Sequence, residues 1–351
     1  MRRRLLASLL VMFGHSYGGD SVPLSAALIV NARTGGILYS NNIDAKTQPA
    51  SIAKMMTLLI AFQQLKQKII RLDSMIKISA NAASQAPCRL GLKCGDSISV
   101  HDAILAMVTK SANDVSVALA EHLAGGSLPR FVDMMNTEAK RLRMTSTRFL
   151  NPSGWKDPQQ LTTARDIAKL SRALLVEYPS YYRFFSTKSF AFKKHIYKNH
   201  NTLLGAKDGI VVDGIKTGFI NASGYNTAVS AKKGRDRLIA VFFGGKSARQ
   251  RDQAVALLLK AGFEKLSARR KAILIAKCTP KSSATHNLLQ AHGKLMAAKT
   301  TKDHATDRRR FFEDIARRKN ILQSKSASTK IHAKAIISDQ HDVKSQRISE
   351  K

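Results

Sequence analysis

The sequence predicts an α/β fold of the α+β type, in which a five-stranded antiparallel sheet is flanked by helices. Two short apolar runs joined by a turn stand near the start of the chain, and three more stand after residue 213. Between them, apolar residues recur at helical spacing. With 351 residues, 44% of them hydrophobic, the chain can bury a sizeable core, which excludes a wholly disordered protein.

The first predicted element is a β-hairpin. Apolar runs at 26–30 and 37–40 flank a turn that contains Gly35 and Gly36. A helix is then expected to open at 49–51. Its apolar residues fall on one side of the predicted helix: Ile52, Met55, Met56, Leu59, Ile60 and Phe62.

Three further helical patterns occupy the middle of the chain. The first covers 101–123, is rich in Ala and Val, and is ended by Gly125 and Gly126. The other two cover 128–143 and 163–176. These segments supply the helices expected to flank the sheet.

The strand pattern returns at 214–220, 225–231 and 237–243, where short apolar runs are separated by polar turns. A last helix is predicted at 248–261. Since two strands come from the start of the chain and three from its later part, we expect the first and last strands to be neighbours in one sheet.

The end of the chain is strongly basic. Residues 265–351 carry 21 Lys and Arg against 7 Asp and Glu, a net +14 of the +34 of the whole chain. Such an excess favours a polyanionic neighbour, such as nucleic acid, an acidic membrane face or an anionic polymer. A strand is expected at 270–277, and the tail over 267–351 is otherwise expected to be largely disordered.

The first 19 residues are typical of a secretory signal peptide. Three Arg residues precede an apolar run at 5–13, and a small-x-small pattern, Ser16-Tyr17-Gly18, follows it. The run is shorter than the ~20 residues that a membrane span needs. We therefore expect a leader at 1–19, a folded domain at 20–266 and export to the periplasm or cell envelope; the alternative is the frayed N-terminal helix of a cytosolic protein.

Three cysteines, Cys88, Cys94 and Cys278, are too few for a disulfide scaffold and lack the C-x-x-C spacing of zinc sites. Cys88 and Cys94 could close a small loop or remain free thiols. The sequence leaves both alternatives open.

A Ser-x-x-Lys motif, Ser51 to Lys54, stands at the start of the first predicted helix. Positions i and i+3 face the same way, so the hydroxyl and the amine lie within reach of each other. The positive end of the helix dipole disfavours a further charge on Lys54, and a lysine shifted towards neutrality is the base that a serine nucleophile needs. Alone, this motif is weak because it occurs by chance in many proteins.

Two further motifs carry chemistry. Ser111-Ala112-Asn113 offers a hydroxyl that can relay a proton and an amide that can hold a carbonyl group, although a polar capping turn is the commoner explanation of such a segment. Lys216-Thr217-Gly218 stands on the first of the late strands and offers a cation and a hydroxyl to a carboxylate. Gly218 would let the substrate backbone come close.

The three motifs occur in this order, with spacings of 60 and 105 residues between their first members. This set is typical of penicillin-binding proteins and β-lactamases. Over about 25–266 the chain resembles the serine-type D-alanyl-D-alanine carboxypeptidases, the low-molecular-mass penicillin-binding proteins of peptidase family S11. The resemblance implies a β-lactamase/transpeptidase-like domain, and it extends through the segments 49–57, 110–114, 149–154 and 213–218.

The resemblance implies a hydrolase that removes the terminal D-alanine from peptidoglycan stem peptides without a metal or cofactor. Ser51 would attack the carbonyl carbon, Lys54 would take its proton, and Ser111 with Lys216 would pass a proton to the departing D-alanine. Backbone N–H groups of Ser51 and Phe219 would form the oxyanion hole. The implied substrate-binding residues are Asn113, Lys216, Thr217, Gly218, Phe219 and Arg251.

The assignment of Arg251 has an alternative in a solvated helix charge, since Arg249 is only two residues away. The sequence does not decide whether the carboxypeptidase activity is accompanied by endopeptidase or transpeptidase activity.

Two other functions are to be weighed. A serine β-lactamase shares the motifs, but class A enzymes need a general-base Glu between the second and third motifs. No Glu lies between Glu138 and Glu177, so a carboxypeptidase inhibited by β-lactams is favoured. A non-catalytic basic envelope-binding protein would not need to keep all the motif residues.

The tail would attach the enzyme to an anionic membrane surface or wall polymer, at the periphery of the cytoplasmic membrane. Residues 308–319 are a basic amphipathic candidate for this role, or else a solvated charged helix. Nucleic acid is not expected as a partner because the tail lacks stacking aromatic residues.

Overall fold

The structure is a computed structural model and describes residues 26–155 and 157–278. The chain divides into two units after Lys271, and the architecture below is that of the first unit. The predicted leader and the tail beyond residue 278 lie outside the described residues.

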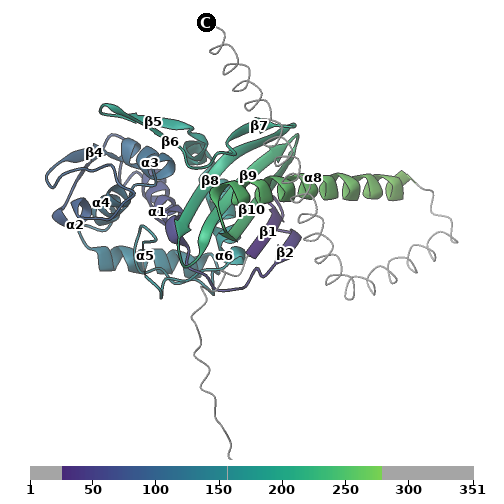
Figure 1. Ribbon diagram of the computed structural model, residues 1–351, viewed down its shortest axis with the longest axis horizontal. Helices are drawn as coiled ribbons and strands as arrows, with labels where there is room; N and C mark the ends of the chain where they lie inside the picture. The colour runs from purple at the N-terminus through teal and green to yellow at the C-terminus, as the bar shows by residue number, and fades with distance from the viewer. Residues whose placement is uncertain (1–25, 156, 279–351) are drawn as a thin grey trace, which may run out of the picture. The chain divides into compact units, whose positions relative to one another are not determined.

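A twisted antiparallel sheet forms the centre of the domain (Figure 1). The five predicted strands are confirmed, and the first pairs with the last as expected: Ala26 lies opposite Phe243. A short sixth strand is added at one edge, so the order is β2-β1-β10-β9-β8-β7. The strands are β1 (Ala26–Asn31), β2 (Ile37–Asn41), β7 (Gly205–Lys207), β8 (Ile210–Ile220), β9 (Gly224–Lys233) and β10 (Asp236–Gly245).

The helices and two small two-stranded sheets complete the domain. In one, β3 (Met75–Lys77) pairs antiparallel with β4 (Ser97–Ser99), with α2 (Ala80–Ala83) in the connection between them, and in the other β5 (Ser189–Phe192) and β6 (His195–Lys198) form a hairpin. The helices are η1 (Ala50–Ala53), α1 (Lys54–Lys66), α2 (Ala80–Ala83), α3 (Val100–Thr109), α4 (Asn113–Leu123), α5 (Leu128–Arg141), α6 (Ala164–Glu177), α7 (Pro179–Tyr182), η2 (Arg183–Ser186) and α8 (Ala248–Cys278).

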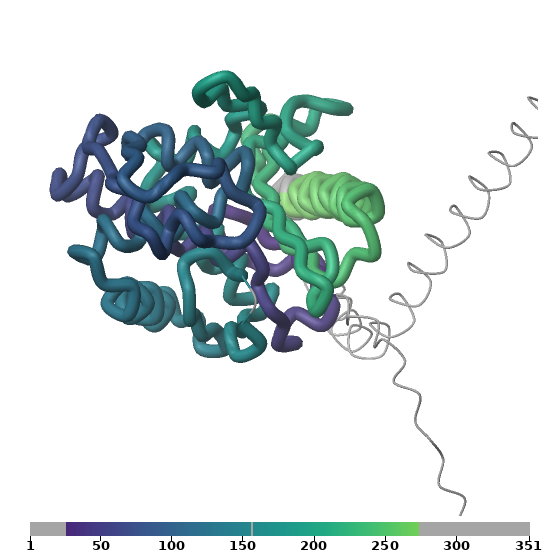
Figure 2. The backbone as a smooth tube through the Cα atoms, turned by 60° about the vertical axis from the view of Figure 1, so that its left-hand side comes forward, coloured from purple at the N-terminus to yellow at the C-terminus, as the bar shows by residue number. Residues whose placement is uncertain are grey.

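Both faces of the sheet are covered, which explains why β1 is apolar at five successive positions, 26–30, rather than at alternate ones. Leu28 and Val30 join the core that contains the helices of the central cluster. Ile29 points to the other face, where a Cβ added to Gly262 of α8 would lie 3.1 Å from its side chain. Figure 2 shows α8 in light green on one side of the strands and the blue helices on the other.

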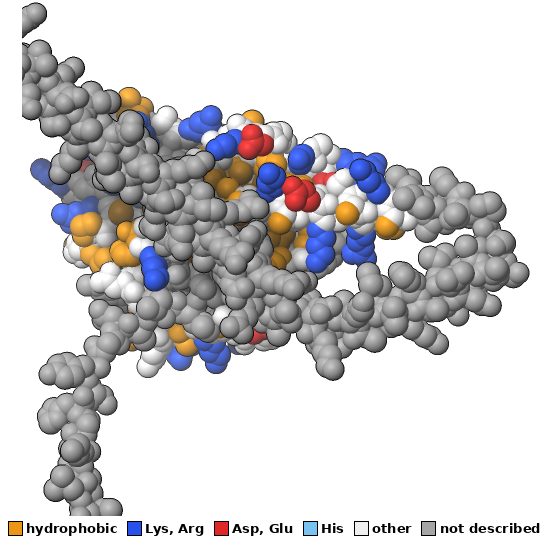
Figure 3. All heavy atoms as spheres, turned by 45° about the vertical axis from the view of Figure 1, so that its right-hand side comes forward, with side chains coloured by type: hydrophobic (Ala, Val, Ile, Leu, Met, Phe, Trp, Pro, Cys, Tyr) orange, Lys and Arg blue, Asp and Glu red, His pale blue; other side chains and the backbone are white. Residues whose placement is uncertain are grey.

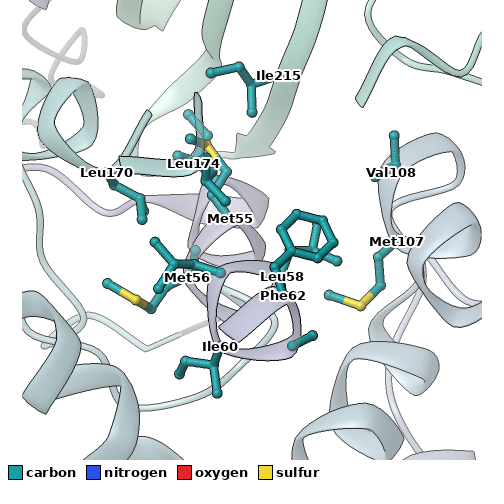
Figure 4. Close-up of a cluster of buried hydrophobic side chains, with 14 of the residues drawn as sticks. Met55, Met56, Leu58, Ile60, Phe62, Met107, Val108, Leu170, Leu174 and Ile215 are labelled. Carbon is teal, nitrogen blue, oxygen red and sulfur yellow. The ribbon is translucent and has the colours of Figure 1, made fainter. Parts of the chain in front are cut away.

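Helix α1 is buried on all sides, whereas the sequence predicted one buried side. Thr57, Leu58 and Ala61 are as inaccessible as Met55 and Met56, which were expected to be buried. The reason is that α4, α5 and α6 pack around α1 while η1 leads into it. Figure 4 shows this packing, with side chains of α3, α6 and β8 around those of α1.

The strand predicted at 270–277 is wrong, because α8 continues through it to Cys278. No Gly or Pro interrupts 264–278, and its Ala, Lys, Arg and Leu residues favour propagation of a helix that has already begun. Figure 3 shows Lys and Arg side chains in blue on the side of the molecule where α8 lies. No helix of the described chain is long and apolar enough to cross a membrane.

Candidate active site

Ser51 and Lys54 lie where a tight turn becomes the buried helix α1. Ser51 belongs to η1 and is partly accessible, whereas Lys54 is fully buried. Three-residue spacing in a 3₁₀ turn places the two side chains on one side. Lys54 Nζ lies 3.1 Å from Ser51 Oγ, so the predicted pair is formed.

Lys54 has two further oxygen partners, from two other parts of the chain. Its Nζ lies 2.7 Å from Asn113 Oδ1 and 2.7 Å from the backbone oxygen of Ser153. Burial lowers the pKa of Lys54 well below its usual value, and the positive charge of Lys216 lowers it further. Both effects favour the uncharged form of the amine.

The second motif forms a break between two helices. The helical stretch predicted over 101–123 is divided at the Ser-x-Asn motif, where a turn between two helices was weighed: α3 ends at Thr109 and α4 begins at Asn113. Ser111 sits in the break with a left-handed backbone, φ 61°. Its Oγ is buried and, within the described chain, has no hydrogen-bond partner. A buried hydroxyl in this state is available to a bound substrate.

Asn113 connects the second motif to Lys54 and to a neighbouring loop. Its Nδ2 donates to the backbone oxygens of Ala86 (3.0 Å) and Pro87 (3.2 Å), which fixes the orientation of the amide. The amide oxygen is thereby directed at Lys54.

Asp114 was not predicted as a site residue, yet it anchors the same loop. Its carboxylate accepts hydrogen bonds from the backbone N–H groups of Leu90, Gly91, Leu92 and Val115. An acidic residue directly after the Ser-x-Asn motif was the only signal for this role.

The loop at 151–154 supplies the backbone oxygen that Lys54 uses. Thr57 and Ser116 both donate to the backbone oxygen of Pro152 at 2.8 Å, which ties the loop to α1 and α4. Gly154 has φ 82°, and a Cβ there would lie 1.8 Å from the backbone oxygen of Ala50. Only glycine fits between this loop and the turn of Ser51.

The third motif lies on β8, next to the turn of Ser51. Lys216 and Thr217 are buried, and Lys216 Nζ donates to the backbone oxygen of Thr217 at 3.0 Å. Burial lowers the pKa of Lys216 to about 7, and the charge of Arg251 contributes in the same direction. A Cβ at Gly218 would lie 3.1 Å from the backbone nitrogen of Ser51. The glycine therefore lets β8 pass close to the turn that contains Ser51.

The remaining predicted residues flank this arrangement. Phe219 is exposed, and its ring lies 4.3 Å from that of Tyr225. Arg251 is 3% exposed, whereas Arg249 is exposed, so only Arg251 is held inside the protein. Its Nε donates to Asp252 at 2.8 Å.

Asp252 and Thr202 were missed by sequence reasoning. The second carboxylate oxygen of Asp252 accepts a 2.5 Å hydrogen bond from Thr202 Oγ1. Thr202 lies 50 residues away in the chain, and no motif marks it.

Cys88 and Cys94 are both free thiols. Within 26–155 and 157–278, no three His, Cys, Asp or Glu side chains gather in a group that could hold a metal ion.

Comparison with known proteins agrees with this geometry. A family model described as D-alanyl-D-alanine carboxypeptidase matches residues 17–247. D-alanyl-D-alanine carboxypeptidase DacC of Escherichia coli is 38% identical over 249 residues, which are 69% of this chain and 62% of DacC. The chain therefore spans less than two thirds of that relative.

Solved structures are similar as well. Penicillin binding protein 5 from Haemophilus influenzae is 34% identical, with a TM-score of 0.66 over 68% of this chain and 70% of the other. Penicillin-Binding Protein D2 from Listeria monocytogenes, solved in an ampicillin-bound form, is 29% identical, with a TM-score of 0.59 over 68% and 96% of the two chains.

Proposed function

We propose that this chain, which belongs to the D-alanyl-D-alanine carboxypeptidase family, is itself a serine carboxypeptidase that removes the terminal D-alanine from peptidoglycan stem peptides. The reaction would pass through an acyl-enzyme on Ser51, and β-lactams would acylate the same residue.

The hydrogen bonds of Lys54 are the observation that carries this proposal. A neutral amine has two N–H bonds and one lone pair. Asn113 Oδ1 and the backbone oxygen of Ser153, both at 2.7 Å, take the two N–H bonds. The lone pair is then left for the hydroxyl of Ser51 at 3.1 Å. Lys54 is thus arranged as the general base that activates Ser51.

The other motif residues complete the cycle. As Ser51 attacks the carbonyl carbon, backbone N–H groups of Ser51 and Phe219 receive the negative oxygen, each worth about 3 kcal/mol. Ser111, together with Lys216, would pass a proton to the departing amine of D-alanine. Water then hydrolyses the ester on Ser51.

Residues around Ser51 and Lys54 would bind the substrate. Lys216, Thr217 and Arg251 would hold the terminal carboxylate, and Asn113 would orient the acyl peptide. Gly218 is required because the β8 backbone passes so close to Ser51.

A β-lactamase is the second candidate, and the structure gives no observation in its favour. The backbone oxygen of Ser153 occupies one side of Lys54, and it cannot act as the base that class A enzymes use for deacylation. We therefore expect penicillin to remain on Ser51 for long periods.

Mass spectrometry of the intact protein tests the proposal. Benzylpenicillin is expected to add one equivalent to the wild type and none to Ser51→Ala, while Ser84→Ala, a change at an exposed serine, keeps full labelling. The wild type is also expected to release D-alanine from a D-Ala-D-Ala peptide. Rapid β-lactam turnover without D-alanine release would overturn the assignment.

The remaining proposals concern the limits of the domain and the segments at the two ends of the chain. Residues 1–19 would act as an export signal, the catalytic domain would cover 20–266, and the tail from 267 would hold the enzyme at an anionic membrane or wall surface. Beyond Cys278 the sequence has 16 Lys and Arg against 7 Asp and Glu. A variant lacking 279–351 keeps α8 and is expected to lose salt-sensitive sedimentation with cell envelopes; unchanged sedimentation would refute the role of the tail.

A further inference from the structure

Strand β8, which carries the third motif, is interrupted by one extra residue. Val212 lies opposite Ala231 of β9, and the next pair along the ladder is Gly214 opposite Ser230. Asp213 is therefore added to β8 without a partner of its own, which makes a β-bulge. Bulges are frequent next to active sites, where they redirect side chains. Asp213 has no part in the reaction proposed above.

The extra residue decides which face of the sheet Lys216 occupies. Residues directly opposite each other in a sheet point to the same face, and successive residues alternate. Val212 lies opposite Ala231 and Lys216 lies opposite Ala228. The two partners are three positions apart in β9 and so point to opposite faces. Val212 and Lys216 are four positions apart and would share a face in a regular strand, so the bulge turns Lys216 to the other face.

That face is the one on which the nucleophile lies. Gly218 is two residues beyond Lys216 and shares its face. A Cβ at Gly218 would lie 3.1 Å from the backbone nitrogen of Ser51. Ala228, the partner of Lys216, belongs to the core that contains the central helices. Without the extra residue, Lys216 and Gly218 would face away from Ser51.

An arginine of β10 holds Asp213 in the bulge. Both terminal nitrogens of Arg237 donate to the carboxylate, at 2.9 and 2.8 Å, so the pair is bidentate. Lys232 Nζ lies 3.0 Å from the same carboxylate. Arg237 also donates to Ser230 Oγ at 2.6 Å, and Ser230 is the residue of β9 opposite the bulge. One guanidinium group thus binds both strands at the point where the register changes.

Residues outside these three strands enclose the bulge. A Cβ at Gly214 would lie 2.7 Å from Tyr182 Oη, so α7 packs directly on the backbone there. The guanidinium carbon of Arg237 lies 5.6 Å from the centre of the Tyr182 ring. Asn201 Nδ2 donates to the backbone oxygen of Gly214 at 3.2 Å. Since the bulge is held from several sides, breaking its ion pair is expected to move the backbone that leads to Lys216.

We propose that Asp213 and Arg237 are positioning residues, whose ion pair holds the bulge in β8 and so directs Lys216 to the face of Ser51. This inference rests on the proposed function, which gives Lys216 its part in proton transfer and carboxylate binding. It differs from a general contribution to stability, because it requires Asp213 to act on the reaction through Lys216.

The rate constant for labelling of Ser51 by benzylpenicillin tests the ion pair. Asp213→Asn and Arg237→Gln are each expected to slow labelling about 10- to 100-fold. The double variant should be no slower than the slower single variant, because both changes break the same pair. Asp44→Asn breaks a bidentate pair with Arg165 elsewhere in the domain and should label at the wild-type rate. Labelling of folded Asp213→Asn at the wild-type rate would overturn the inference.

A protein without Lys216 separates positioning from a merely structural role. Labelling of Lys216→Met is expected to be slow already, and adding Asp213→Asn should slow it by a smaller factor than in the wild type. Melting temperatures show that each variant is folded at the assay temperature. If Asp213→Asn slowed labelling by the same factor with and without Lys216, it would not act through Lys216, and the inference would be wrong.

Titration of Lys216 by NMR distinguishes this inference from the proposed function. Burial lowers the pKa of Lys216 to about 7, and its signal in a protein with isotope-labelled lysine is the one absent from Lys216→Met. In Asp213→Asn the pKa is expected to rise towards the ordinary lysine value as Lys216 leaves its buried place, whether or not the wild type releases D-alanine. An unchanged titration in both Asp213→Asn and Arg237→Gln would overturn the inference.

Discussion

Asn113 and Lys54 share a hydrogen bond of 2.7 Å across 59 residues of sequence. This bond joins two of the three motifs. Two residues before Asn113, the hydroxyl of Ser111 has no hydrogen-bond partner within the described chain. The lysine is thus held by the amide, and the serine beside it is kept for the substrate. The predictions that follow concern this arrangement and the residues that support it.

The first prediction concerns the pH dependence of acylation. Burial lowers the pKa of Lys216 to about 7, and Lys216 must be charged to bind a carboxylate. The rate constant for labelling by benzylpenicillin should therefore fall as pH rises through about 7. In Lys216→Arg the guanidinium stays charged beyond pH 12, so the fall should move to higher pH. If the labelling rate constant fell over the same pH range in both proteins, the role of Lys216 would be contradicted.

The second prediction concerns stability. Because burial and Lys216 lower the pKa of Lys54 in the folded protein, the unfolded chain binds more protons at this residue between the folded and unfolded pKa values. The free energy of unfolding should then rise with pH in that interval, by up to about 1.4 kcal/mol per pH unit for one proton. The rise ends near the ordinary lysine pKa.

Lys54→Met removes this proton, so the stability of the wild type relative to the variant should increase between pH 7 and pH 10. Urea unfolding at several pH values measures the difference. Lys216 is present in both proteins, but because its charge acts on Lys54 its contribution cancels only in part. A difference that does not change with pH would mean that Lys54 is charged when buried.

The third prediction concerns Gly154. Alanine there would bring Cβ within 1.8 Å of the backbone oxygen of Ala50, so the turn of Ser51 must move. We expect Gly154→Ala to lower the melting temperature and to slow penicillin labelling at least tenfold. Gly126→Ala is the matched control, since Gly126 also has positive φ but its Cβ meets nothing within 4 Å. It should lose only the ~1–2 kcal/mol of a left-handed backbone and label normally.

The fourth prediction concerns Arg251 and the residue that positions it. Arg251→Ala should raise KM for a D-Ala-D-Ala peptide by about 10- to 100-fold, as expected for loss of a charge-assisted hydrogen bond. Arg249→Ala, at the exposed neighbour, should leave KM unchanged. Asp252→Asn removes the charge that holds Arg251 Nε and should raise KM by less than Arg251→Ala. If Arg251→Ala left KM unchanged, Arg251 would not bind the carboxylate.

The sequence was sufficient to predict those parts of the molecule that depend on local pattern. The β1–β2 hairpin, the three late strands and the Ser51–Lys54 pair follow from alternation, turn residues and helical spacing. The pairing of β1 with β10 followed from counting strands at the two ends.

Other features depend on contacts that a local pattern does not encode. The Ser-x-Asn segment was compatible with a capping turn, but no residue type signalled the left-handed backbone of Ser111 that separates α3 from α4. Strand β7 consists of Gly205, Ala206 and Lys207, none of which favours a strand, and it exists because β8 extends to Ile210 and offers it a partner. The backbone oxygen of Ser153 reaches Lys54 only through the tertiary fold.

The pairing of β1 with β10 also has a consequence for how the protein is made. Strand β1 cannot pair with β10 until the chain has been synthesised as far as Phe243, the partner of Ala26. Ribosomes add about 5–20 residues per second, so roughly 10–40 s separate the appearance of the two partners. During that interval β1 has only β2 beside it, and an apolar strand edge remains open to other chains. A nascent chain of this kind is therefore expected to be most prone to aggregation before its last sheet strand has emerged.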